Sequence, residues 1–365
     1  MKVVIPGDRG QLGYFLREAF GEFSKFKIMP ILFPLAEYWW LYLAFTAGVL
    51  ALVALDLGVF HRDAHEVRFR EAATWCVVWV TLALLFNAAL YVYARWNFAR
   101  DPRLTGLSGF DANAVAWQVA LEFLSGYLVE YSLSVDNIFV FIVILGYFAV
   151  PAKYQHRVLF YGILGALVFR TIFISIGSAL MQFHWVIWIF GLFLIFTGLK
   201  MAFTSDQAVH PERNLLIRAV RRFLPVTGDF HGQNFFLKKD GHVWLTPLAV
   251  ALLCLEASDI VFAIDSVPAI FALTKEPFLV FTSNIFAILG LRSMYFMLGG
   301  AFEKFHLLRY GLAVVLVFVG LKMVWLDSWF GGKFPVGASL LLIASILGTS
   351  VGLSLLFPKR HDSNV

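Results

Sequence analysis

Five acidic residues stand inside long apolar stretches of the sequence, where charged side chains are rare. They are Glu130, Asp136, Glu256, Asp259 and Asp265. A carboxylate at the centre of a bilayer costs about 2.5–3.5 kcal/mol, so a group of them rivals the whole stability of a typical domain, about 5–15 kcal/mol. Each acid must therefore be paired, protonated, hydrated or bound to a cation. Residues of this type in this setting predict an ion-handling site within a membrane.

Positive side chains in the same stretches could neutralise some of these acids. Arg170 and Arg292 lie in the middle of apolar stretches, whereas Lys200 and Lys322 lie near the ends, where a long side chain can reach the membrane interface. Two central arginines cannot neutralise all the acids. Protons or metal cations are the better counter-charges, and the two are compatible because a carboxylate can exchange a proton for a metal. Purely structural pairing remains the alternative.

Oxygen-bearing neighbours accompany the acids and indicate which cation would bind. Ser134 and Asn137 share a helix face with Glu130, and Ser266 shares one with Asp259. Asn284 would add an amide, unless it caps a helix. Carboxylate, amide, hydroxyl and carbonyl oxygens suit Mn²⁺, Mg²⁺ or Ca²⁺ better than Zn²⁺ or Cu⁺.

The remaining two acids, Asp136 and Asp265, fall about 120° away from these faces on a regular helix. An unbroken helix would not aim both acids of a pair at one ion. Pro268 has no backbone N–H to give the carbonyl of Ile264. The sequence therefore predicts a broken helix near 264–268, which would free a carbonyl as a ligand. By symmetry, a break near Asp136 would follow.

The elements that must position these residues are membrane-spanning helices. Of the 365 residues, 60% are hydrophobic and 15% are charged, and the mean hydropathy is +0.78. These values exclude a soluble, disordered or disulfide-rich chain and predict an all-α polytopic membrane protein with about nine spans. The expected spans are Tyr38–Leu55, Thr74–Ala94, Ala114–Val150, Arg157–Leu180, Trp185–Phe203, His242–Leu273, Pro277–Leu298, Tyr310–Leu326 and Phe334–Phe357.

Two three-helix segments, 114–203 and 242–326, resemble each other. Lys200 and Arg170 each recur 122 positions later, as Lys322 and Arg292, within similar sequence. The matched charges follow the same order, acid, acid, arginine, lysine. Because each copy has an odd number of spans, the second must run inverted relative to the first. Inverted repeats with a site near the bilayer midplane are typical of secondary transporters, although an ancient duplication without transport, or a channel, would also fit.

The rest of the chain divides around these repeats. We expect a charged tail at 1–37, peripheral spans at 38–113, a basic loop at 204–241, and a final span with a tail at 327–365. Lys and Arg concentrate in the loops on the side of 204–241 and the C-terminus, which places both in the cytoplasm. The charged tail weakens this contrast, and an alternative is that translation starts at Met29.

Other functions find little support in the sequence. No nucleophile–base pair or nucleotide-binding loop is visible, so we expect no enzyme and no permanently bound cofactor. Nucleic-acid binding is a poor interpretation, because the sequence has no basic domain outside the apolar stretches. His61 and His65 could form a weak metal patch, but a solvated loop is the simpler interpretation. Asp56 and Glu122 are single acids near span ends and are candidates for an ion pathway.

Two long motifs resemble those of the TerC family of integral membrane proteins. The first is Val129–Val140, which contains Glu130 and Asp136, and the second is Leu255–Ile270 with its continuation Ser283–Arg292. The resemblance covers residues 36–358 and, within the family, is strongest to the alkali-inducible Alx branch. The charged tail at 1–37 departs from the family pattern.

The resemblance carries functional expectations. The family is named for tellurium resistance, its bacterial members are implicated in manganese efflux, and a plant relative acts in the chloroplast. It implies that Glu130, Asp136, Glu256, Asp259 and Asp265 handle ions, the same five acids that stand out by their cost in a membrane. Mn²⁺ would then be the substrate exported across the bacterial inner membrane, with its movement coupled to protons or to the membrane potential. Alternatives are transport of another cation, such as Ca²⁺, or a membrane scaffold.

Overall fold

The computed structural model describes residues 30–55, 68–181, 183–203, 225–227, 229–239, 242–298, 307–330 and 334–357. For Asp136 and Asp265 it describes the helical backbone but not the side chains. Most of the predicted tail, His61, His65, Asp56 and most of the 204–241 loop lie outside these residues. Nine of the described helices are long and apolar enough to cross a bilayer, which confirms the all-α polytopic fold.

The nine long helices follow the predicted spans closely. They are α2 (Leu35–Leu55), α3 (Phe69–Phe98), α5 (Ala112–Tyr147), α6 (Ala152–Leu180), α7 (His184–Phe203), α9 (Pro247–Phe271), α10 (Pro277–Leu298), α11 (Leu308–Leu321), whose span continues to Trp329, and α13 (Val336–Leu356). The shorter elements are α4 (Pro102–Thr105), the π-helical turn η5 (Lys322–Leu326), α12 (Asp327–Trp329), and the antiparallel hairpin of β1 (Phe236–Lys239) and β2 (His242–Leu245).

Two predictions about α9 are wrong. The span expected to begin at His242 begins at Pro247, because Thr246 caps the helix by accepting a hydrogen bond from the backbone N–H of Ala249. The helix also runs through Pro268 without the predicted break, and α5 likewise runs through Asp136 without the break expected by symmetry. Pro268 lies close to the helix end at Phe271, where the loss of one backbone hydrogen bond does not interrupt the remaining turn.

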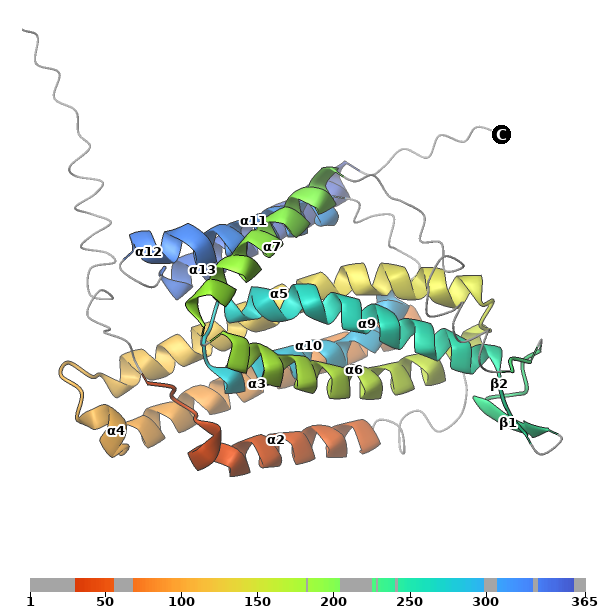
Figure 1. Cartoon of the computed structure of the whole chain (residues 1–365), viewed down its shortest axis with the longest axis horizontal. Helices are drawn as coiled ribbons and strands as arrows, with labels where there is room; N and C mark the ends of the chain where they lie inside the picture. The colour runs from red at the N-terminus through yellow and green to blue at the C-terminus, as the bar shows by residue number, and fades with distance from the viewer. Residues whose placement is uncertain are drawn as a thin grey trace, which may run out of the picture.

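The helices form two groups (Figure 1). The main bundle comprises α2, α3, α5, α6, α9 and α10, with the almost entirely buried α10 at its centre against α3, α5 and α6. The crossing bundle comprises α7, α11 and α13, and α11 packs on both of the others. In Figure 1 the crossing bundle lies against the main bundle near α12 and diverges from it toward the opposite end, where the hairpin lies. We call these two ends the α12 end and the hairpin end.

Glycines allow α7 and α11 to cross with their backbones in contact. A Cβ atom at Gly198 would lie 2.7 Å from the carbonyl oxygen of Ala313, and one at Gly320 would lie 2.6 Å from that of Gly191. Gly320 and Ala313 each lie 122 positions after Gly198 and Gly191, the spacing of the sequence repeat. The crossing therefore consists of two matching contacts, and close backbone approach through small residues is the usual way helices associate in lipid.

Candidate ion-binding site

Arg170 of α6 lies at the centre of a buried polar cluster and is only 1% exposed. Its Nη1 donates hydrogen bonds to Oε1 of Glu130 on α5 and, at 3.0 Å, to Oγ of Ser266 on α9. Arg170 also interacts electrostatically with Asp259 of α9. One side chain thus joins predicted ion-handling residues from both copies of the repeat.

Glu256 extends this cluster on the side of α6. Its carboxylate interacts electrostatically with Asp259 and lies directly over Gly165, where a Cβ atom would come within 2.0 Å of Oε1. Gly165 therefore provides the space that the carboxylate occupies. We call Glu130, Arg170, Glu256, Asp259 and Ser266 the central polar cluster.

Several polar atoms in this region are buried without a hydrogen-bond partner among the described residues. They are Oε2 of Glu130, Oε2 of Glu256, Nε of Arg170 and both amide atoms of Asn284. Buried polar atoms in folded proteins nearly always have partners, so each exception calls for an explanation. Most of these atoms are oxygens, and an oxygen donor set fits a hard divalent cation.

The predicted site residues Ser134, Asn137, Asn284 and Arg292 are also buried. Ser134 is buried, but its hydroxyl donates to the carbonyl of Glu130 on the same helix. Asn137 and Arg292 are buried on α5 and α10. Asn284 is fully buried within α10, so it does not cap a helix.

The described side chains do not by themselves complete a metal site. Among them, no three His, Cys, Asp or Glu residues are placed to hold one metal ion. The side chains of Asp136 and Asp265, which the sequence assigns to the site, are outside this description. The structure thus brings Glu130, Asp259 and Ser266 together around an arginine.

A second buried acidic cluster lies at the α12 end. Glu122 of α5 accepts hydrogen bonds from Nε2 of Gln118 at 2.7 Å and from Oγ1 of Thr274 at 2.5 Å. Thr274 lies in the turn between α9 and α10, and its Oγ1 also accepts the backbone N–H of Glu276 at 3.2 Å. Glu122 therefore has structural partners at both oxygens. Sequence reasoning singled out Glu122 but missed Thr274 and Glu276. Both lie in the turn between α9 and α10, outside the apolar stretches in which a charged residue stands out.

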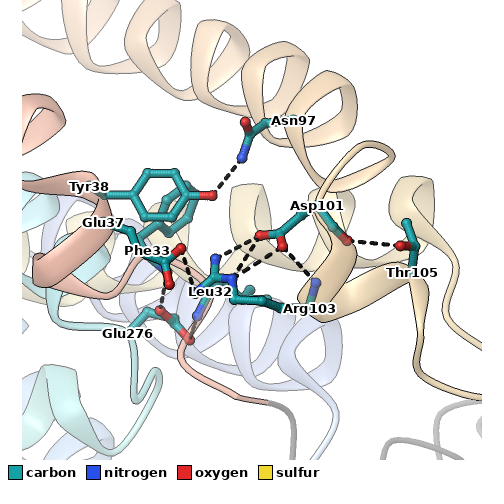
Figure 2. A network of polar contacts seen from close by, with 9 residues as sticks. All are labelled: Leu32, Phe33, Glu37, Tyr38, Asn97, Asp101, Arg103, Thr105 and Glu276. Atoms are coloured by element: carbon teal, nitrogen blue, oxygen red, sulfur yellow. Dashed lines mark hydrogen bonds and ion pairs between the residues drawn. The ribbon is translucent and has the colours of Figure 1, made fainter.

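Glu276 fastens the segment before α2 to this cluster (Figure 2). Its two carboxylate oxygens accept the backbone N–H groups of Leu32 and Phe33 at 2.9 and 3.3 Å. Leu32 and Phe33 fall within the predicted 1–37 tail, yet both side chains are buried. We call Glu122, Thr274 and Glu276, with this backbone segment, the end clamp.

Figure 2 also shows an ion-pair network next to the end clamp. The guanidinium of Arg103 lies 2.6 Å from Asp101 and 3.1 Å from Glu37. Nδ2 of Asn97 donates to the hydroxyl of Tyr38 at 2.6 Å. These contacts connect the start of α2 to the end of α3 and to α4.

Lys322 does not follow the prediction that Lys200 and Lys322 both reach the membrane interface. It is 2% exposed, and its Nζ donates to the carbonyl of Ala272 at 2.6 Å and lies 3.3 Å from Oδ1 of Asp327. The expectation that Lys322 reaches the interface is therefore wrong, because a carbonyl at the end of α9 and an acid on α12 surround its ammonium. Lys200, its counterpart in the first repeat, is exposed.

Comparison with known proteins identifies the family. Residues 115–362 match the profile of the Integral membrane protein TerC family, which is more than half of the chain. The chain belongs to the TerC family. The match includes every residue of the central polar cluster and excludes α2 and α3.

Similar TerC-family proteins cover most of the chain. A membrane protein of Myxococcus xanthus designated STKORF319 is 51% identical over 322 residues, which are 88% of this chain and 93% of that protein. The Alx protein of Escherichia coli (strain K12), whose name proposes a membrane-bound redox modulator, is 45% identical over 320 residues, or 87% of this chain and 95% of that protein. No solved structure matches the chain.

Proposed function

We propose that this TerC-family protein is a secondary transporter that exports Mn²⁺ across the bacterial cytoplasmic membrane. The observation that carries the proposal is the buried contact of Arg170 with Glu130 and Ser266, which gathers polar residues of both repeats inside an apolar helix bundle. Intramembrane ionisable residues of this kind mark ion pathways. The oxygen donors around them match the preference of Mn²⁺.

The inverted repeat predicted from the sequence supports transport over a purely structural role. The matched glycine contacts between α7 and α11 are those expected if an axis of two-fold symmetry passed between the repeats. The packing partners match as well, because α5 packs on α10 as α6 packs on α9. Under this symmetry the ion site lies between the repeats, where either membrane face can gain access to it.

Arg170 acts in this mechanism as the counter-charge of the ion-free state. Its guanidinium compensates Glu130 and Asp259, which would otherwise be buried without a cation. A bound Mn²⁺ takes over that compensation, and protons can do so on the return step. Arg292 serves the second repeat in the same way, and Asp136, Asn137, Asp265 and Asn284 add oxygen ligands.

The charge distribution sets the orientation of the protein in the membrane. We place the hairpin end, the 204–241 loop and the C-terminus in the cytoplasm, because Lys and Arg concentrate there. The α12 end then faces the outside of the cell. No resident cofactor is needed, since Mn²⁺ is the substrate.

Cellular manganese after a Mn²⁺ challenge tests the proposal directly. The host lacks its own exporters and expresses either the native protein or the Asp136→Asn, Asp265→Asn double variant. We expect lower total manganese with the native protein only. Equal manganese in both strains, with both proteins present in the membrane, would contradict export.

A matched glycine pair on α6 tests the role of Glu256. A Cβ atom at Gly165 would collide with the Glu256 carboxylate, whereas one at Gly162 would lie 3.9 Å from Leu252, an ordinary contact. Gly165→Ala should therefore abolish export by displacing a flexible carboxylate while the protein still folds, and Gly162→Ala should leave export intact. Equal export by the two variants would contradict a role for Glu256 in the ion-binding site.

Transport by purified protein in liposomes separates the remaining alternatives. Influx of Ca²⁺ or Na⁺ with no Mn²⁺ flux would assign another cation to the same acids. No flux of any cation, with partner assembly unaffected by Asp136→Asn, would favour a membrane scaffold.

A further inference from the structure

Two lysines related by the sequence repeat occupy opposite ends of the crossing bundle. Lys200 follows Gly198 near the end of α7, and Lys322 follows Gly320 at the end of α11. Figure 1 shows α7 ending away from α12, whereas α11 leads into α12. The glycine crossing lies between them, so the two ammonium groups are carried at the two ends of one rigid pair of helices.

Lys322 bonds the crossing bundle to the main bundle. The carbonyl that it contacts belongs to Ala272, which caps the C-terminus of α9. A cation is favoured at a helix C-terminus, where carbonyl groups lack partners and the helix dipole is negative. The bond to Ala272 therefore holds the two bundles together at the α12 end.

The equivalent bond is missing from the described structure at the hairpin end. There α5 ends with its cap at Phe148, in the turn 148–151 that precedes α6. Lys200 is exposed rather than bound to this turn, and the crossing bundle stands away from the main bundle at this end (Figure 1). The two halves of the repeat thus differ in whether their lysine is docked.

We propose that Lys322 and Lys200 are alternating latches, which hold the crossing bundle against the C-terminus of α9 in one transport state and against that of α5 in the other. The proposal rests on the transport function proposed above. In the structure described, Lys322 is engaged and the α12 end is closed. Tilting of the crossing bundle breaks the bond to Ala272, opens that end and brings Lys200 to the carbonyls of the turn after α5.

The main bundle has its own connections at the α12 end, and these do not involve the latch. Glu122, Thr274 and Glu276 join α5, the turn between α9 and α10, and the segment before α2, all within the main bundle. Lys322 is different because its hydrogen bond to Ala272 crosses from one bundle to the other. Tilting can therefore break this bond while the end clamp stays intact.

A cysteine reporter near the latch measures which state is populated. Ala269 on α9 is fully buried and belongs to the same apolar cluster as side chains of α11. In an Ala269→Cys protein, labelling by a membrane-impermeant maleimide in spheroplasts reports opening at the α12 end. The native cysteines, Cys76 and Cys254, are buried, and a protein without the reporter gives their background.

Removal of each lysine should shift this labelling in opposite directions. We expect Lys322→Met to raise the labelling rate about tenfold, as for loss of a hydrogen bond to a charged group. Lys200→Met, which removes the same charge, should lower it, because the opposite state loses its latch. Lys322→Arg should stay close to the native rate, and Lys238→Met on the exposed hairpin should leave it unchanged.

The outcomes distinguish the latch from the transport function and from a merely structural lysine. If Lys322→Met fails to fold, Asp327→Asn serves instead. It removes the carboxylate that holds the Lys322 ammonium in place, and it should also raise the labelling of the reporter cysteine. Unchanged labelling in Lys200→Met, or equal shifts in both lysine variants, overturns the latch even if Mn²⁺ flux is observed. Opposite shifts without Mn²⁺ flux support the latch and contradict the choice of substrate.

Discussion

The central polar cluster and the end clamp are both buried sets of charged side chains in an apolar bundle, and they differ in how completely they are hydrogen-bonded. In the end clamp, all four carboxylate oxygens of Glu122 and Glu276 accept a hydrogen bond. In the central polar cluster, Glu130 and Glu256 each keep one buried oxygen with no partner among the described residues. Asn284 on the neighbouring α10 has neither amide atom bonded there.

This difference separates charges that hold the fold from charges that serve an ion. A fully satisfied buried network specifies one arrangement, and losing any member is costly. A cluster whose acceptor oxygens have no partner in the protein can still bind a cation or a proton. Both regions bury charged side chains. They differ in whether each carboxylate oxygen has a hydrogen-bond partner.

The largest effect is expected at Arg170, whose guanidinium forms an ion pair with Glu130 in the central polar cluster. Arg170→Met leaves Glu130 buried without its cation, and breaking a buried ion pair in this way costs about 3–5 kcal/mol. We expect a correspondingly large drop in the free energy of unfolding of the purified protein, measured by denaturation with SDS.

The double variant provides the control for this effect. Arg170→Met with Glu130→Gln removes both charges and should recover much of the lost stability, since an apolar replacement of the whole pair is often neutral. A double variant as unstable as Arg170→Met would mean that packing of the arginine matters more than its charge.

The end clamp should show the complementary behaviour. Glu276→Gln leaves one oxygen for the backbone N–H groups of Leu32 and Phe33 and removes the charge that strengthens these bonds, so we expect a loss of about 1.5–3 kcal/mol. Ion flux per folded molecule in liposomes should not change. Loss of flux with native stability would show that the clamp takes part in transport and would erase the distinction between the two regions.

The spans and the acidic residues were predictable because they depend on local composition. A stretch of about twenty apolar residues predicts a membrane helix wherever it occurs, and Glu130 and Asp259 stand out because charge is rare in such stretches. The end clamp could not be found in this way. Glu276 follows the apolar stretch of α9, and its role depends on meeting Leu32 and Phe33, which are distant in sequence.

Two of the wrong predictions share a line of reasoning. Proline was taken to break α9 at Pro268, and Lys322 was expected to reach the interface, because both inferences considered one helix alone. In the structure Pro268 lies close to the natural end of its helix, and Lys322 meets the carbonyl of Ala272 from another bundle. The position of the helix end decided the first, and a tertiary contact decided the second.

The smallest effect is expected at the ion pair that borders the end clamp. The Arg103 guanidinium beside Asp101 holds the pKa of that carboxyl below its ordinary value of 3.8. A lowered pKa stabilises the fold above the ordinary value, and this contribution disappears as the pH falls through the lowered one. Because Arg103 is partly exposed, we expect Asp101→Asn to cost less than about 1 kcal/mol at neutral pH.

Thermal unfolding at neutral and acidic pH measures this contribution against a matched control. Asp111 caps α5 through the N–H of Asn113, much as Asp101 caps α4 through that of Arg103, but Asp111 bonds no arginine in the described structure. Since Asn also caps helices well, Asp111→Asn should change the midpoint little at either pH. The destabilisation by Asp101→Asn should shrink in acid, and a pH-independent loss would assign its effect to the cap instead of the ion pair. With that result, Asp101 would stabilise the fold by helix capping alone, and its ion pair with Arg103 would add nothing to the buried end clamp beside it.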